Sequence, residues 1–165
     1  MTEQIFWQLI EEAWQHVAPD LAKRRHELAY SSTEMKEESE LGNDFASVID
    51  EDIVEYLTEK LKEVDQVELQ AFDKILEQKL YDIDREDIQQ FTDGSDDGFL
   101  YCRGFIVGMG KDYYDSIYKD PGFAAAYLEA ESFCYFSWHL HEELHGEYTE
   151  SEISRETGSN AKHWS

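Results

Sequence analysis

Residues 99–118 read FLYCRGFIVGMGKDYYDSIY, and residues 123–146 read FAAAYLEAESFCYFSWHLHEELHG. In the first stretch, apolar side chains recur every three or four residues, which is the period of one face of an α-helix. The second stretch is apolar on nearly all sides and follows Pro121, a residue type favoured in the first turn of a helix. The two stretches therefore predict long helices, Phe99–Tyr118 and Phe123–His145, at the core of the fold.

Shorter stretches outside this core have the same helical period. They predict helices at Glu3–Val17, from Asp20 to about Tyr30, from Asp44 to Val64, from Leu69 to Leu80, and around Arg85 to Phe91. Asp44 is expected to be the N-cap of the third of these helices. The polar stretch from Ser31 to Asn43 predicts a surface loop or a frayed helix.

The chain has 165 residues, which is the usual length of one domain. We therefore expect an all-α, single-domain bundle of about six or seven helices over residues 1–146. Residues 147–165 are expected to form a polar C-terminal tail that is partly loose, with Trp164 as its one anchor.

The chain carries 14 Lys and Arg against 38 Asp and Glu, a net charge of −24. Such a surface repels nucleic-acid phosphates and anionic membranes, which excludes direct binding to either through a basic face. Because 41% of the residues are hydrophobic and 14% are aromatic, the chain is not a disordered acidic tail. The acidic excess is present in every part of the chain, so we expect a folded surface that is negative on most sides.

Three further features predict a cytoplasmic protein. No apolar run approaches the roughly 18 to 20 residues that span a bilayer. The first residues lack the basic and apolar regions of a secretion signal. Cys102 and Cys134 are read as reduced, buried thiols, and a single disulfide between them is the alternative.

Residues 141–145, HEELH, match the H-E-x-x-H pattern of zinc-dependent hydrolases. On a helix, His141 and His145 lie on the same side, where they can share a zinc ion, with Glu142 as the general base. Three features weaken this reading: the charged residue Glu143, the absence of a third histidine at the usual spacing, and a position close to the end of the chain. The alternative reading is a helix C-terminus at which histidines complement the helix dipole. We assign no metal, cofactor or catalytic residue on this motif.

Residues 93–98, DGSDDG, resemble the first half of a calcium-binding EF-hand loop. The twelfth position of such a loop falls on Gly104, where a glutamate is required, so the calcium site is incomplete. The alternative is a turn in which Ser95 or Asp97 caps the following helix.

Arg103 follows Asp96 by seven residues and lies on about the same helical face, beside an apolar stripe. We expect these two side chains to form a buried or half-buried pair that organises the start of the helix, with a ligand-binding pair as the alternative. Gly104 and Gly108 on this helix predict the close approach of a neighbouring helix.

Several segments resemble a bacterial family known only as domain of unknown function forty-two-forty. The similarity is carried by FWQLIEEA at residues 6–13, LQAF at residues 69–72 and, most specifically, GSDDGFLYCRGFIV at residues 94–107. Gly110, Tyr114 and Asp120-Pro121 follow at the expected places, whereas Cys102 replaces an aromatic residue. The resemblance covers about two-thirds of the chain, and it implies that residues 20–60 are a divergent or inserted part of the domain. It implies a small, mainly helical, cytosolic bacterial protein and no established reaction.

Three classes of function remain open from these residues. The first is a non-enzymatic acidic protein that captures or inhibits a basic protein partner, such as a toxin, a nuclease or another nucleic-acid-binding enzyme, in the manner of an immunity protein or a nucleic-acid mimic. The second is a metal-dependent hydrolase that uses the HEELH helix. The third is a small-ligand regulatory module with Asp96, Asp97 and Arg103 around an aromatic pocket. The first class is preferred, and the oligomeric state is left open.

The candidate binding residues are acids of the polar stretches and of the start of the core helix, together with one arginine. They are Glu34, Glu37, Glu38, Asp50, Glu51, Asp52, Asp82, Asp84, Asp87, Asp96, Asp97 and Arg103. The acids are expected to be exposed, because they would attract the basic partner and occupy its phosphate-binding groove.

Overall fold

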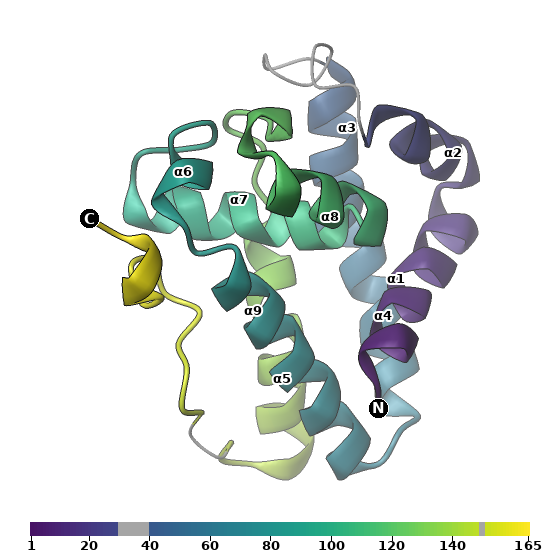
Figure 1. Cartoon of the computed structure of the whole chain (residues 1–165). Coiled ribbons are helices and arrows are strands. Elements are labelled where there is room, and N and C mark those ends of the chain that lie inside the picture. The colour runs from purple at the N-terminus through teal and green to yellow at the C-terminus, as the bar shows by residue number, and fades with distance from the viewer. Residues whose placement is uncertain (30–39, 149–150) are drawn as a thin grey trace.

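Helix α9 lies at the centre of the fold and contacts α4, α5 and α7 (Figure 1). The computed structural model describes residues 1–29, 40–148 and 151–165. The α-helices in these ranges are α1 (Glu3–Val17), α2 (Pro19–Leu28), α3 (Glu40–Val48), α4 (Val54–Lys62), α5 (Gln66–Asp82), α6 (Glu86–Gln89), α7 (Asp96–Gly108), α8 (Lys111–Lys119) and α9 (Glu131–His145). The same ranges hold short turns at Pro121–Phe123 and Ala161–His163 and contain no strand, which confirms the all-α, single-domain fold.

Most helix boundaries outside the core agree with the sequence patterns. Helix α1 has the predicted bounds, and the Thr2 side chain accepts a hydrogen bond from the backbone N–H of Ile5 at its start. Helix α5 starts one turn earlier than predicted because the Asp65 side chain caps it, accepting from the N–H of Glu68. Most of the Ser31–Asn43 stretch lies outside the described residues.

Helices α3 and α4 join through a π-helical turn, Ile49–Ile53, into one continuous helix. The helix begins at Glu40, so the prediction that Asp44 is its N-cap was wrong. Its buried side chains are spaced by four residues: Phe45, Ile49, Ile53, Leu57 and Leu61. On a regular α-helix this spacing rotates the apolar face by about 40° per step. A π turn takes more residues per turn, which offsets the rotation and keeps these side chains on the core.

The predicted helix Phe99–Tyr118 is divided at Gly110, where the chain changes direction between α7 and α8 (Figure 1). Gly110 has a φ of 93°, a conformation that side chains with a Cβ rarely adopt. The buried Arg25 of α2 lies against this position and donates from Nη1 to the carbonyl oxygen of Met109 at 2.7 Å. The helical period continues through the break, which is why the pattern predicted one helix instead of two.

The predicted helix Phe123–His145 forms only over its last 15 residues. Residues 124–130 are irregular, and α9 begins at Glu131. Long-range bonds hold this segment instead: Ala130 N–H donates to the carbonyl oxygen of Tyr101, and the Asp50 carboxylate accepts from Ser132 N–H at 2.6 Å. Tertiary contacts thus override the helix propensity of the alanines.

Small residues on α7 allow the close helix packing that the sequence predicted. A Cβ on Gly104 would lie 2.5 Å from the carbonyl oxygen of Ala130, and a Cβ on Gly108 would overlap the side chain of Ile49. Cys102 and Cys134 are both buried and free, as expected from the sequence. Among the described residues, none of the helices is long and apolar enough to cross a lipid bilayer.

The C-terminal segment, residues 151–165, packs against the bundle, although the sequence predicted a partly loose tail. It runs along one flank of α5 and α9 and returns to α6 and α7 (Figure 1, yellow). Arg155 and Asn160 are buried, and Trp164 Nε1 donates to the carbonyl oxygen of Asp84 at 3.1 Å. The segment thereby forms one wall of the pocket described next.

Candidate functional site

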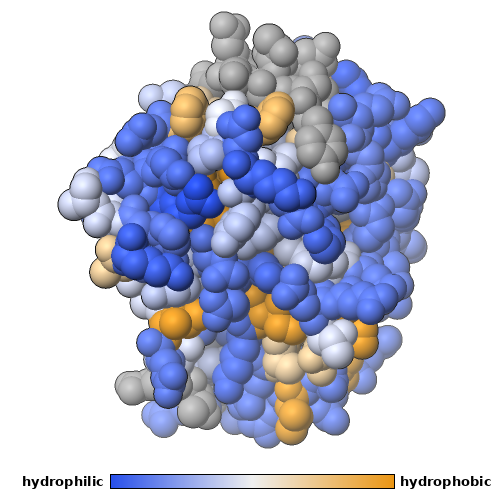
Figure 2. All heavy atoms as spheres, in the orientation of Figure 1, coloured by the Kyte–Doolittle hydropathy of each residue, from blue (hydrophilic) through white to orange (hydrophobic). Residues whose placement is uncertain are grey.

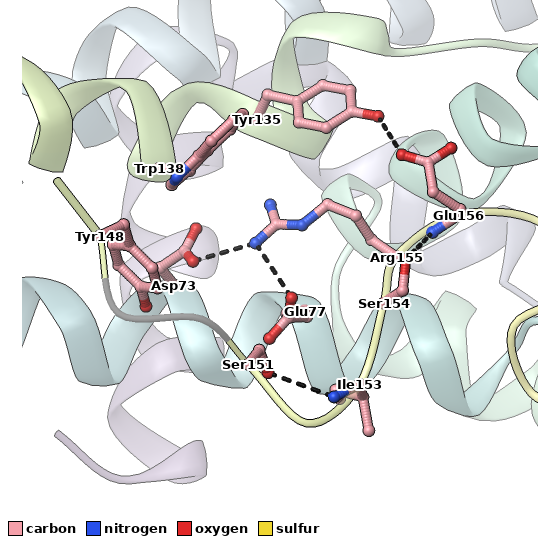
Figure 3. A pocket seen from close by; sticks show the side chains of 10 residues that line it. All are labelled: Asp73, Glu77, Tyr135, Trp138, Tyr148, Ser151, Ile153, Ser154, Arg155 and Glu156. Atoms are coloured by element: carbon pink, nitrogen blue, oxygen red, sulfur yellow. Dashed lines mark hydrogen bonds and ion pairs between the residues drawn. The ribbon is translucent and has the colours of Figure 1, made fainter.

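A pocket of about 350 Å³ lies where the C-terminal segment crosses α5 and α9 (Figure 3). Helix α5, helix α9 with the residues that follow it, and the C-terminal segment each provide part of its wall. The lining residues are Asp73, Glu77, Tyr135, Trp138, Tyr148, Ser151, Ile153, Ser154, Arg155 and Glu156. Its volume is within the range of small-ligand sites in proteins.

The acidic side of the pocket comes from two residues one turn apart on α5. Asp73 is fully buried and accepts a hydrogen bond from Ser137 Oγ on α9 at 2.7 Å. Glu77 is 8% exposed. Both residues belong to the face of α5 that also buries Leu69 and Leu76. Carboxylates at core positions of a helix are unfavourable unless a cation or hydrogen-bond donors satisfy them.

The guanidinium of Arg155 lies between these carboxylates and hydrogen-bonds Asp73 (Figure 3). Its Nη2 lies 2.9 Å from Asp73 Oδ2 and 3.8 Å from Glu77 Oε1. Its Nη1 donates to the carbonyl oxygen of Cys134 at 2.5 Å. The guanidinium carbon also lies over the Tyr135 ring, 5.7 Å from the centroid, which adds a cation–π contact.

Tyrosine hydroxyls border the same space. Burial raises the pKa of Tyr135, and the neighbouring Glu156 carboxylate raises it further. Burial likewise raises the pKa of Tyr148, together with the charge of Asp73. Both phenols therefore stay neutral donors: Tyr135 donates to Glu156 Oε1 and Tyr148 to the carbonyl oxygen of Gln70. Carboxylates, neutral phenols and aromatic faces together make a site suited to an organic cation.

Arg103 anchors the C-terminal segment beside this pocket instead of pairing with Asp96, so the predicted Arg103–Asp96 pair was wrong. Arg103 is fully buried and donates to the carbonyl oxygens of Leu80 and Arg155, each at 2.9 Å, and to Thr157 Oγ1 at 3.1 Å. Burial lowers its pKa and the nearby charge of Asp84 raises it, with a net lowering. The local spacing could not reveal partners that lie up to 54 residues away.

Asp84 is a second anchor, and the expectation that it is an exposed binding residue was wrong. Its carboxylate is fully buried. It accepts hydrogen bonds from the backbone N–H groups of Gly158 at 3.0 Å and Asn160 at 2.8 Å. Two buried charged residues, Arg103 and Asp84, thus hold successive parts of the C-terminal segment, residues 155–157 and 158–160.

The other candidate acids divide into two groups. Asp82 accepts a hydrogen bond from Gln78, and Asp87 forms an ion pair with Arg85, so both have local partners. Arg85 lowers the pKa of Asp87 through this contact. Glu34, Glu37 and Glu38 lie outside the described residues.

Two of the remaining candidate acids, Asp50 and Asp97, lie near the start of α9. We call this region the acidic end, and its residues are Asp50, Asp93, Asp97, Glu129 and Glu131. Glu51, Asp52 and Asp96 are exposed neighbours of Asp50 and Asp97 along the chain. Asp50 caps α9 at Ser132, next to Glu131, and Glu131 accepts a hydrogen bond from Tyr101, which also experiences the charge of Asp97. The pKa of Glu129 is raised, first by burial and then by the charges of Asp93 and Glu131. Within the part of the chain that the structure describes, no ion pair joins these carboxylates to a cation.

The HEELH histidines have different surroundings. His141 is fully buried, and the side-chain amides of Gln66 and Gln70 lie 3.3 Å and 3.0 Å from its Nε2. Glu142 and His145 are exposed, and the two imidazole centroids are 5.3 Å apart. In residues 1–29, 40–148 and 151–165, no group of three His, Cys, Asp or Glu side chains has the arrangement of a metal site.

The DGSDDG turn caps α7. The Ser95 side chain accepts from the N–H of Gly98, as expected from the sequence, and Asp93 Oδ1 in turn accepts from the N–H and hydroxyl of Ser95 at 2.6 Å each. Asp96 and Asp97 occupy the first turn, where negative charge complements the helix dipole.

The pocket residues were not among the candidates from the sequence. One signal was present: Asp73 and Glu77 interrupt the apolar face of an amphipathic helix at a spacing of four residues. Their cation, Arg155, lies 82 residues from Asp73 in a segment without helical period. Sequence reasoning therefore had no local pattern that would join them.

The protein is thus an all-α, single-domain protein with an acidic surface and a pocket between α5 and α9. The chain belongs to the family described as "Protein of unknown function (DUF4240)", whose family model matches residues 37–150. The resemblance inferred from the sequence is thereby confirmed. The matched range includes the pocket acids of α5, the GSDDGFLYCRGFIV segment and α9, but not residues 6–13 or the C-terminal segment. Neither the curated proteins nor the solved structures contained a match.

Proposed function

We propose that this chain is a non-enzymatic binding protein whose acidic surface captures a basic protein partner. A toxin, a nuclease or another nucleic-acid-binding enzyme has the required chemistry, because its phosphate-binding groove attracts carboxylates. The chain would then act as an inhibitor in the manner of an immunity protein or a nucleic-acid mimic. We also propose a cytoplasmic location, since two free, buried thiols suit a reducing compartment.

The observation that carries this proposal is the surface location of the net charge. Among the described residues, the buried charged side chains are Arg25, Arg103, Arg155, Asp73, Glu77 and Asp84. Three positive and three negative groups balance, so the core contributes nothing to the net charge of −24. Three of the five arginines are buried and therefore add no positive charge to the surface. Figure 2 shows a predominantly hydrophilic face, with hydrophobic atoms only in small groups.

The acidic end supports the proposal a step further. The raised pKa of Glu129 reflects its burial and the repulsion between its carboxylate and those of Asp93 and Glu131. A basic partner would relieve this repulsion, and its binding energy would include that gain.

The proposal is tested by capture at low salt. The immobilised protein is incubated with a lysate of its source organism in 50 mM and 500 mM salt, and the bound proteins are identified by mass spectrometry. We expect one basic protein to be retained at low salt and released at high salt, because screening weakens an electrostatic complex. The recombinant candidate is then titrated with the purified protein, and displacement of a DNA oligonucleotide from it is measured.

Two sets of variants test whether the partner binds the acidic end or responds only to the total negative charge of the protein. Asp97→Asn with Glu129→Gln and Glu131→Gln removes three charges from the acidic end. Glu12→Gln with Glu27→Gln and Glu63→Gln removes three exposed charges from other parts of the surface. We expect the first set to weaken binding at least tenfold more than the second. Failure to retain any basic protein at low salt would contradict the proposed function, and equal weakening by both sets would contradict the role of the acidic end.

A further inference from the structure

We propose that the space between α5 and α9 is a guanidinium-binding site, which Arg155 fills in the free protein and an arginine side chain of the basic partner fills in the complex. The existence of this partner rests on the proposed function. The guanidinium chemistry rests on the contacts of Arg155 alone.

The acceptors around Arg155 are arranged for a planar fork of donors. Nη1 and Nη2 reach two different acceptors, the carbonyl oxygen of Cys134 and the carboxylate of Asp73, at 2.5 Å and 2.9 Å. The Tyr135 ring covers the guanidinium. A guanidinium can satisfy two such acceptors and stack on a ring at the same time, whereas an ammonium offers a single charged point. The site therefore favours arginine over lysine.

Arg155 leaves part of this site unused. Glu77 is 8% exposed, yet its nearest oxygen is 3.8 Å from Arg155 Nη2, longer than a hydrogen bond. Three carboxylates, those of Asp73, Glu77 and Glu156, line the pocket against one arginine. The adjoining volume of about 350 Å³, bordered by Trp138, gives an entering side chain room to approach Glu77.

The backbone at Arg155 is held independently of its side chain. Its carbonyl oxygen accepts from the buried Arg103, and Asp84 holds the N–H groups of Gly158 and Asn160 further along. The side chain of Arg155 can therefore rotate out while the C-terminal segment stays docked. Asp73 and Glu77 lie within the range that matches the family model, and Arg155 and Glu156 lie outside it. The family domain thus provides the two carboxylates of α5, and the C-terminal segment provides the internal occupant and part of the wall.

Chemical rescue of Arg155→Ala tests the site. This variant loses the guanidinium but keeps the anchors at Arg103 and Asp84, so we expect it to fold with a lower Tm. Ethylguanidinium at 1–20 mM should raise its Tm by several degrees and leave the wild-type Tm unchanged. Ethylammonium at the same concentrations should give less than a third of this shift. Equal shifts from both cations, or no shift, would overturn the proposal.

Two double variants locate the binding of ethylguanidinium. Arg155→Ala with Glu77→Gln should lose most of the rescue. Arg155→Ala with Glu143→Gln removes an equal charge from an exposed position on α9 and should keep it. Arg155→Lys serves as a second background if Arg155→Ala does not fold, because it retains a positive charge beside Asp73. Ethylguanidinium should raise its Tm as well, by a smaller amount.

Calorimetric titration with N-acetyl-arginine amide tests the exchange between the two arginines. Because Arg155 competes for the site, Arg155→Ala should bind this compound at least tenfold more tightly than the wild type does. N-acetyl-lysine amide should bind both proteins weakly. Equal affinity of the two proteins for the arginine compound would overturn the internal competition. These titrations contain no partner protein, so a negative result would not contradict the proposed capture of a basic protein. Likewise, failure of the capture experiment would not contradict the guanidinium-binding site.

Discussion

Arg103 on α7 donates a hydrogen bond from Nη2 to the backbone carbonyl oxygen of Arg155, 2.9 Å away. This bond connects the most specific sequence segment of the family domain to a C-terminal segment that the family model does not match. It also positions the arginine that lines the pocket between α5 and α9. The sequence predicted that Arg103 pairs with the nearby Asp96, whereas in the structure Arg103 holds the distant C-terminal segment in place.

Replacement of Arg103 by Met should therefore destabilise the whole protein. The change leaves the carbonyl oxygens of Leu80 and Arg155 without their donor and removes the positive charge near Asp84. We expect the free energy of unfolding in urea to fall by about 3 kcal/mol. Arg24→Met, at an exposed position, should change it by less than about 0.5 kcal/mol. Similar losses in both variants would show that Arg103 has no special structural role.

Gly110→Ala tests the break between α7 and α8. Gly110 has a φ of 93°, and a Cβ there would overlap Nη1 of the buried Arg25. We expect a loss of about 1–3 kcal/mol in the free energy of unfolding. Gly94→Ala is the matched control, because a Cβ at Gly94 meets nothing within 4 Å. If Gly110→Ala were as stable as Gly94→Ala, the break would not depend on glycine.

The two thiols should be unreactive in the folded protein. Burial raises the pKa of Cys134 to about 12, and burial together with the charges of Glu129 and Asp93 raises the pKa of Cys102. Ellman's reagent at pH 8 should therefore label neither cysteine in buffer and both in 8 M urea. Rapid labelling in buffer would contradict the burial of these side chains.

The same shifts make stability depend on pH on the alkaline side. Each thiol has a higher pKa when folded than when unfolded, so its contribution to stability is fully present below the unfolded pKa of about 8.5. It is lost progressively as the pH rises from there toward the folded pKa. Between pH 8 and pH 10, Cys134→Ala should lose less stability than the wild type does. Parallel losses in the two proteins would contradict this linkage.

The HEELH helix gives a prediction that separates the metal-dependent hydrolase from a structural role. Because Gln66 and Gln70 contact Nε2 of the buried His141, we expect EDTA to leave the Tm unchanged. His145→Ala, at an exposed position, should alter the free energy of unfolding by less than about 0.5 kcal/mol. Stoichiometric zinc in the purified protein, lost on His145→Ala, would instead support the hydrolase.

The helical period identified the apolar faces correctly and failed at the helix ends inside the core. The bounds of α1 follow from the pattern and from Pro19, since both are local. The pattern could not reveal the break at Gly110, because the apolar period continues from α7 into α8. It also could not show that residues 124–130 bond to Tyr101 and Thr92 instead of forming a helical turn.

The sequence by itself determined the all-α class, the apolar faces of the helices and the net charge of −24, since each depends on composition or on spacings of a few residues. Tertiary structure decided which charged residues become buried. The pairs that build the pocket and its clamp, Asp73 with Arg155 and Arg103 with Arg155, are 82 and 52 residues apart. A buried charge is tolerated only where the folded chain brings an oppositely charged or hydrogen-bonding partner to it. Sequence patterns of a few residues cannot predict such a contact between distant segments.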